Sequence, residues 1–109
     1  MKDSKIFSLP EAVHIKQMIV EGSELAAFEV QHVTPANGTD FTLAELQGIV
    51  GGLIEIVELS GGLIMVVNEE FLSNGDRFNP IATEAAQQLT GREHFICGSV
   101  LICRTEQVR

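Results

Sequence analysis

The residue types that most often perform enzyme chemistry are present in this chain, but their spacing assembles none of them into a catalytic arrangement. Glu69 and Glu70 are adjacent, so on a strand their side chains point to opposite faces and cannot form a working carboxylate pair. Cys97 and His94 are three residues apart, which would place a thiol nucleophile and its base on opposite faces of a strand. We therefore assign no catalytic residue and expect a protein that is not an enzyme.

Histidine and cysteine spacing predicts no metal site. The histidines follow no HxH or HxxxH pattern, and Cys97 and Cys103 form no CxxC pair, so neither a metal nor another cofactor is expected. On one strand the two thiols would lie about 20 Å apart at ~3.3 Å per residue, which is too far for a disulfide. Two free, buried thiols fit a reducing compartment, and no apolar signal segment or membrane span is evident. A cytoplasmic location without membrane contact is the expectation.

Composition favours one domain with an acidic surface. A chain of 109 residues, of which 45% are hydrophobic, fits a single domain over residues 1–109 with residues 1–10 as a loosely ordered tail. Seven Lys and Arg against fifteen Asp and Glu give a net charge of −8, which opposes the counterion release that drives nucleic-acid binding. Direct binding to DNA or RNA is not expected. An acidic surface maintains solubility, or it imitates nucleic acid towards a basic protein partner.

Two β-hairpins account for most of the predicted strands. Residues 13–20 and 25–33 predict the first hairpin, and residues 34–40 carry turn-forming residues that predict a loop. Residues 53–59 and 63–69 predict the second hairpin around a Gly-Gly tip. Both faces of this second hairpin are apolar near the middle, so helices, another subunit or a ligand must cover them.

The register of the second hairpin places one polar pair at its open end. If Gly61 and Gly62 form a two-residue type I′ turn, Ser60 lies opposite Leu63 and Glu55 lies opposite Asn68.

Two helix starts are also visible. Thr42 predicts an N-cap, with Glu45 completing a capping box, for a helix that ends before Gly51. Asn79 predicts the N-cap of a second helix, which has proline at its first position and ends at Gly91. Both helices are short.

The last predicted strand covers residues 94–104 and is apolar on both faces, which suits a central position. The element order is ββ-α-ββ-α-β, an α+β fold with an antiparallel or mixed sheet. Because both faces of the sheet are apolar, a homo-oligomer is expected.

Four segments carry a resemblance to a known family. They are LQGIVGGLIEIV at residues 46–57, VVNEE at 66–70, NPIAT at 79–83 and ICGSVLIC at 96–103. In order and spacing they resemble a family of short phage and plasmid accessory proteins defined as domain of unknown function 3846. The resemblance covers about the C-terminal two thirds of the chain. It implies a mobile-element setting, with the host-cell cytoplasm as location if the gene is phage-borne, and it implies no established reaction.

Polar residues in and beside these segments are the candidate ligand contacts. Such side chains could hydrogen-bond the edges of a base or ribose. The candidate ligand-binding residues are Glu55, Asn68, Glu69, Arg77, Asn79 and Thr83. The alternative for two of them is structural, with Asn79 as a helix cap and Asn68 as a strand-end turn residue.

A nucleotide phosphate would need positive charge or free amides in this acidic chain. Arg77, Arg92, Arg104 and the amides beside Gly51 and Gly52 are the available supply. The sharpest functional expectation is a non-enzymatic counter-defence protein that sequesters a nucleotide-derived immune signal, acting as a sponge. The competing expectation is an acidic protein–protein inhibitor, or a DNA mimic, of a host nucleic-acid enzyme.

Overall fold

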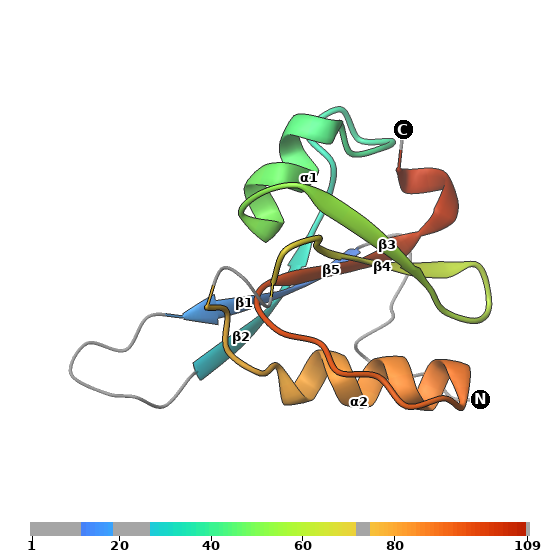
Figure 1. Ribbon diagram of the computed structural model, residues 1–109. Helices are drawn as coiled ribbons and strands as arrows, with labels where there is room; N and C mark the ends of the chain where they lie inside the picture. The colour runs from blue at the N-terminus through green and yellow to red at the C-terminus, as the bar shows by residue number, and fades with distance from the viewer. Residues whose placement is uncertain (1–11, 19–26, 72–74, 109) are drawn as a thin grey trace.

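A five-stranded antiparallel sheet forms the centre of the protein, with one helix on each side of it (Figure 1). The computed structural model describes residues 12–18, 27–71 and 75–108. The elements in chain order are β1 (Ala12–Met18), β2 (Ala27–Val33), α1 (Leu43–Val50), β3 (Ile54–Glu58), β4 (Leu63–Asn68), α2 (Pro80–Thr90), β5 (Val100–Arg104) and the short 3-10 helix η2 (Thr105–Gln107).

The α+β fold and the order of its elements are confirmed. Strands lie in the order β2-β1-β5-β4-β3, and every pairing is antiparallel, so the mixed sheet is ruled out among the described strands. Residues 34–40 contain no helix or strand, as predicted for a loop. The predicted tail at residues 1–10, and the inner ends of the first two predicted strands, lie outside the described residues.

The last strand is shorter than predicted, although its central position between β1 and β4 is confirmed. It begins at Val100, and residues 94–99 are irregular apart from an isolated bridge at Cys97. Gly98 has φ +79°, a left-handed conformation that interrupts an extended strand. Cys97 and Cys103 are both free and buried, but they do not share one strand.

Each face of the sheet is covered by one helix of this chain. On one face, Leu46 and Val50 of α1 pack with strand residues such as Leu101. On the other, three alanines of α2 lie in a core that includes Val13 and Ile102. The apolar character of both faces is therefore accounted for by the two helices, and it gives no reason to invoke a second subunit.

The register of the β3–β4 hairpin differs from the prediction by one residue. Both tip glycines have positive φ, as a type I′ turn requires, and the Leu63 amide donates to the Ser60 carbonyl at 3.3 Å. The Leu59 amide, however, donates to the Leu63 carbonyl at 3.0 Å. Leu59 and Ser60, which follow β3, thus both lie opposite Leu63, as in a β-bulge.

This shift changes which side chains meet across the hairpin. Ile54 lies opposite Asn68, and Glu55 lies opposite Val67. The predicted pairing of Glu55 with Asn68 is wrong, and the two side chains lie on opposite faces of the sheet.

The start of α1 is stabilised by the predicted capping box. The Thr42 hydroxyl accepts from the Glu45 amide at 3.2 Å, and the Glu45 carboxylate accepts from the Thr42 amide at 2.8 Å. A second carboxylate oxygen of Glu45 accepts from the Ala36 amide at 2.9 Å. One side chain therefore connects the 34–40 loop to the helix.

These hydrogen bonds predict an acid-dependent loss of stability that Glu45→Gln should reduce. The backbone amides of Thr42 and Ala36 lower the pKa of Glu45 below its ordinary value of 4.5. A lowered pKa in the folded state contributes stability above pH 4.5, and that contribution is lost as the pH falls through the folded-state pKa. Urea unfolding at pH 6 and pH 3.5 should show a smaller difference for Glu45→Gln than for the parent protein. Equal differences would mean that the carboxylate does not stabilise the fold.

Candidate functional site

A polar groove of about 440 Å³ lies at the C-terminal end of α1. Its charged and polar lining residues are His14, Lys16, Gln17, Asp76 and Ser99, and the last turn of α1 completes the wall. A neighbouring hollow of about 310 Å³ continues past Gly51, which lines both, to Asn68. The two hollows together surround the end of the helix.

The sheet places the groove side chains by simple alternation along β1. Val13 and Ile15 point into the core beneath α2, so His14 and Lys16 point to the α1 face. Because α1 ends at Val50, a part of this face is left open. Ser99 precedes β5, the neighbour of β1, and its hydroxyl accepts from the Gln17 amide at 2.9 Å.

Asp76 enters the groove from the chain segment before α2 and lies directly on Gly98. A Cβ on Gly98 would come within 2.7 Å of an Asp76 carboxylate oxygen. Burial raises the pKa of Asp76. No hydrogen bond or ion pair joins this carboxyl group to another residue in the described part of the chain.

The His14 side chain has an atom that also needs a partner. Its Nε2 is buried and makes no hydrogen bond to any described residue. Burial lowers the pKa of His14, and the charge of Lys16 lowers it further, although the Ile49 backbone acts in the opposite direction. The ring is therefore neutral near pH 7. Buried polar atoms are nearly always hydrogen-bonded, so this nitrogen is positioned for a ligand or a bound water.

The groove combines groups of opposite electrostatic character. Lys16 supplies a cation, while Asp76 supplies a carboxyl group. The end of α1 adds backbone carbonyls and the negative end of the helix dipole. Such a groove suits a ligand that carries hydrogen-bond donors at one end and an anionic group at the other.

Three of the predicted site residues are buried, and their polar atoms bind the backbone. Asn68 donates to the Val50 carbonyl at 3.2 Å and accepts from the Glu70 amide at 2.7 Å. Asn79 accepts from the Ala82 amide at 3.0 Å and donates to the Gly98 carbonyl at 2.8 Å. The prediction of Asn79 as a helix cap is confirmed.

Thr83, the third buried residue, is held by one neighbouring segment. Its hydroxyl donates to the Ile96 carbonyl at 3.3 Å and accepts from the Ile96 amide at 3.0 Å. It therefore fastens α2 to the irregular segment before β5.

The other three predicted residues are exposed. Glu55 is on the α2 face of the sheet, and Glu69 follows β4, where its amide donates to the Leu53 carbonyl at 2.8 Å. Arg77 adjoins Asp76 in the chain, and its amide donates to the Gln17 side chain at 2.9 Å. The six predicted residues are thus not gathered in one place, and of them only Asn68 lines one of the two hollows described above.

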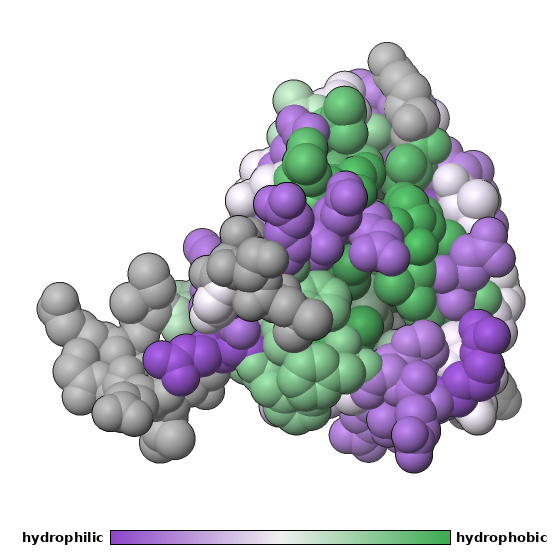
Figure 2. Space-filling view, viewed as in Figure 1, coloured by the Kyte–Doolittle hydropathy of each residue, from purple (hydrophilic) through white to green (hydrophobic). Residues whose placement is uncertain are grey.

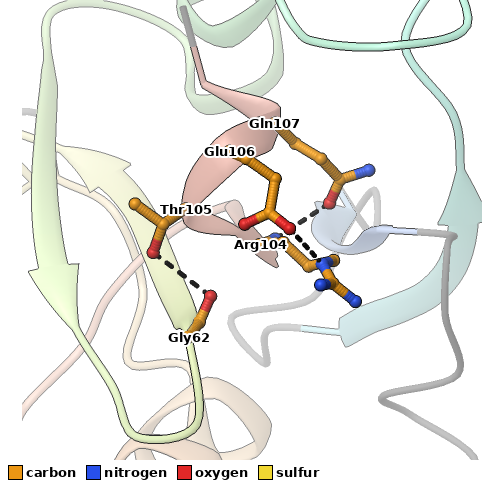
Figure 3. A network of polar contacts seen from close by, with 5 residues as sticks. All are labelled: Gly62, Arg104, Thr105, Glu106 and Gln107. Carbon is orange, nitrogen blue, oxygen red and sulfur yellow. Dashed lines mark hydrogen bonds and ion pairs between the residues drawn. The ribbon is translucent and has the colours of Figure 1, made fainter.

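The predicted phosphate-binding groups are not assembled either. Both the Gly51 and Gly52 amides donate to the Gln47 carbonyl, at 2.8 and 3.1 Å, so they form no free anion nest and that interpretation was wrong. Arg104 pairs with Glu106 at 2.8 Å (Figure 3). It lies where β5 meets the β3–β4 hairpin tip, because Thr105 bonds the Gly62 carbonyl. In the groove, Lys16 is the remaining cation.

The sequence contained a signal for two of the groove residues, His14 and Lys16. The alternation Val13, His14, Ile15, Lys16 marks a strand with two polar side chains on one face. Asp76 and Ser99 could not be assigned to that face, because only the folded chain brings their segments beside β1.

The family model of DUF3846, a domain of unknown function, matches residues 15–108. The chain belongs to the DUF3846 family. The match begins in β1 and so covers more of the chain than the four segments that first suggested it. No curated protein and no solved structure matches the chain. Among the described residues, no group of His, Cys, Asp or Glu is placed to hold a metal ion, and no helix is long and apolar enough to cross a membrane.

Proposed function

We propose that this DUF3846 protein is a non-enzymatic binding protein of a phage or mobile element that sequesters a nucleotide-derived immune signal. One observation carries the proposal: the groove at the end of α1 holds a lysine, a carboxyl group and a buried imidazole nitrogen, none hydrogen-bonded to or ion-paired with another described residue. Polar groups left without partners in one hollow are typical of a site completed by a ligand.

A nucleotide matches the groups of the groove. The amino group of a base could donate to Asp76 or to the last carbonyls of α1, while a phosphate could reach Lys16. The volume of about 440 Å³ is within the usual range for small-molecule sites. The bound ligand would neutralise part of the charge on the groove side chains.

Binding without chemistry is supported by the state of the nucleophiles. Burial raises the pKa of the Cys97 thiol, with Asp76 adding to the effect, and burial raises the pKa of Cys103 to about 12. Thiols in this state are poor nucleophiles. His14 Nε2 also makes no hydrogen bond to Ser99, so the serine of the groove is not paired with the histidine of the groove.

The test is binding of cyclic dinucleotides and ADP-ribose, measured by thermal shift and calorimetry. A ligand at 100 times its Kd should raise the Tm by about 10 °C. Lys16→Ala and Asp76→Asn should each weaken binding at least tenfold, because each removes one groove contact. Arg104→Ala is the matched control, since Arg104 pairs with Glu106 away from the groove, and it should bind as the parent does.

Two outcomes would contradict this proposal. One is the absence of any shift with these nucleotides and of any nucleotide in native mass spectra of protein from cells with an induced immune pathway. The other is equal binding by Lys16→Ala and the parent protein. Recovery of a chemically altered nucleotide would instead contradict the non-enzymatic part.

A second candidate function is an acidic inhibitor of a protein partner. It is favoured by Phe78 and Phe95, which are 46% and 57% exposed and stack with ring centroids 5.2 Å apart. Exposed aromatic pairs are frequent anchors of protein interfaces. This candidate predicts salt-sensitive association with a basic host enzyme that Phe95→Ala abolishes and Lys16→Ala leaves unchanged.

A further inference from the structure

β3 is an edge strand of the sheet, and among the described residues no strand pairs with its outer edge. The Glu69 amide donates to the Leu53 carbonyl at 2.8 Å, and the Leu59 amide donates to the Leu63 carbonyl at 3.0 Å. In an antiparallel ladder, residues alternate between facing the partner strand and facing away from it. The backbone amides and carbonyls that point away from β4 are therefore those of Ile54, Ile56 and Glu58. No described residue hydrogen-bonds to these groups.

The surface at this edge is partly apolar. Ile56 is 40% exposed, and Leu53, just before the strand, is 55% exposed. In the space-filling view, hydrophobic side chains continue from the region of α1 towards β3, beside hydrophilic ones (Figure 2). Exposed strand edges with apolar residues readily pair with another strand. The charges of Glu55 and Glu58 in β3 determine which strand can pair with this edge.

We propose that β3 pairs antiparallel with β3 of a second copy of this chain, across a two-fold axis at Ile56. This register places Ile54 opposite Glu58 of the partner subunit, and it places the two Ile56 side chains opposite each other. Glu55 lies opposite Val57 of the partner subunit. All five residues of β3 are paired, and no glutamate faces a glutamate.

Neighbouring registers are less favourable. A shift of two residues in one direction places Glu55 opposite the partner's Glu55, which like charges disfavour. The opposite shift leaves Ile54 outside the ladder. A two-fold contact uses the same surface on both subunits and leaves neither β3 edge free. The product is one continuous ten-stranded sheet, and it leaves the α1 groove open in each subunit.

A single strand pair is a small interface, so the dimer should dissociate in the micromolar range. The test is sedimentation velocity across protein concentrations with two matched lysine variants. Ile56→Lys should raise the dimer Kd at least tenfold, because it places two like charges opposite each other. Val30→Lys is the control, since Val30 is 39% exposed on β2, the strand at the other edge of the sheet, and its Kd should stay within twofold of the parent.

Cysteine cross-linking tests the register itself. Opposed residues of such a pair have Cα atoms about 5.5 Å apart, which a disulfide can span. Ile56→Cys should form a disulfide-linked dimer on mild oxidation, whereas Glu58→Cys should not, because its own copy lies four residues along the partner strand. A monomer at every concentration would overturn the proposal, as would cross-linking of Val30→Cys or Glu58→Cys in preference to Ile56→Cys.

Discussion

Gly98→Ala is expected to destabilise the protein by about 3 kcal/mol, the sum of a strained backbone and a steric clash. Gly98 has φ +79°, where a side chain costs about 1–2 kcal/mol. The added Cβ would also lie 2.7 Å from the carboxylate of Asp76, so Asp76 must move out of the groove. Urea unfolding followed by circular dichroism measures the loss, since the chain contains no Trp or Tyr.

Gly61→Ala separates the two causes. Gly61 has φ +70°, and a Cβ there would meet nothing within 4 Å, so only the backbone term of about 1 kcal/mol remains. Adding Asp76→Ala to Gly98→Ala should recover most of the difference between the two glycine variants. If Gly98→Ala and Gly61→Ala lose the same stability, Asp76 does not rest on Gly98 and the groove geometry is wrong.

Features set by neighbouring residues could be predicted from the sequence. The capping box of Thr42 and Glu45 and the cap at Asn79 each depend on residues within one helical turn. The central position of β5 followed from apolar residues on both of its faces. These signals come from neighbouring residues, and the structure confirms the predictions made from them.

Features set by distant segments could not be predicted. The hairpin register moved by one residue at Leu59, beside a tip whose Gly62 carbonyl is bound by Thr105 from the end of β5. The strand predicted over residues 94–104 is interrupted by Gly98, and Thr83 of α2 takes up the amide and carbonyl of Ile96. The alternation of apolar and polar residues along the sequence predicts neither of these two contacts.

The groove was missed for the same reason. Its groups come from β1, the end of α1, the segment before α2 and the segment before β5. Asn68, by contrast, was noticed as a polar residue at a strand end, and its amide instead binds the Val50 carbonyl at the end of α1. Asn68 is buried, and its side chain supports the wall of the groove through the Val50 carbonyl.

Asn79→Ala is expected to cost about 3 kcal/mol, more than a helix cap alone provides. Asn79 is fully buried. Removing its side chain loses the cap on the Ala82 amide, worth about 1 kcal/mol. It also leaves the buried Gly98 carbonyl without its donor, which costs about 1–3 kcal/mol. Urea unfolding should show the loss as a lower midpoint with an unchanged slope.

Two variants test whether both bonds of Asn79 matter. Thr42→Ala removes the cap of α1 at a half-buried position, and it should cost about 1 kcal/mol. Asn79→Asp keeps the oxygen that caps Ala82 but faces the Gly98 carbonyl with a second acceptor, so it should remain well below the parent in stability at pH 7. Parent-like stability of Asn79→Asp would show that the bond to Gly98 contributes little. In that case Gly98, and with it the position of Asp76 in the groove, is held by the Arg77 carbonyl that accepts from the Gly98 amide.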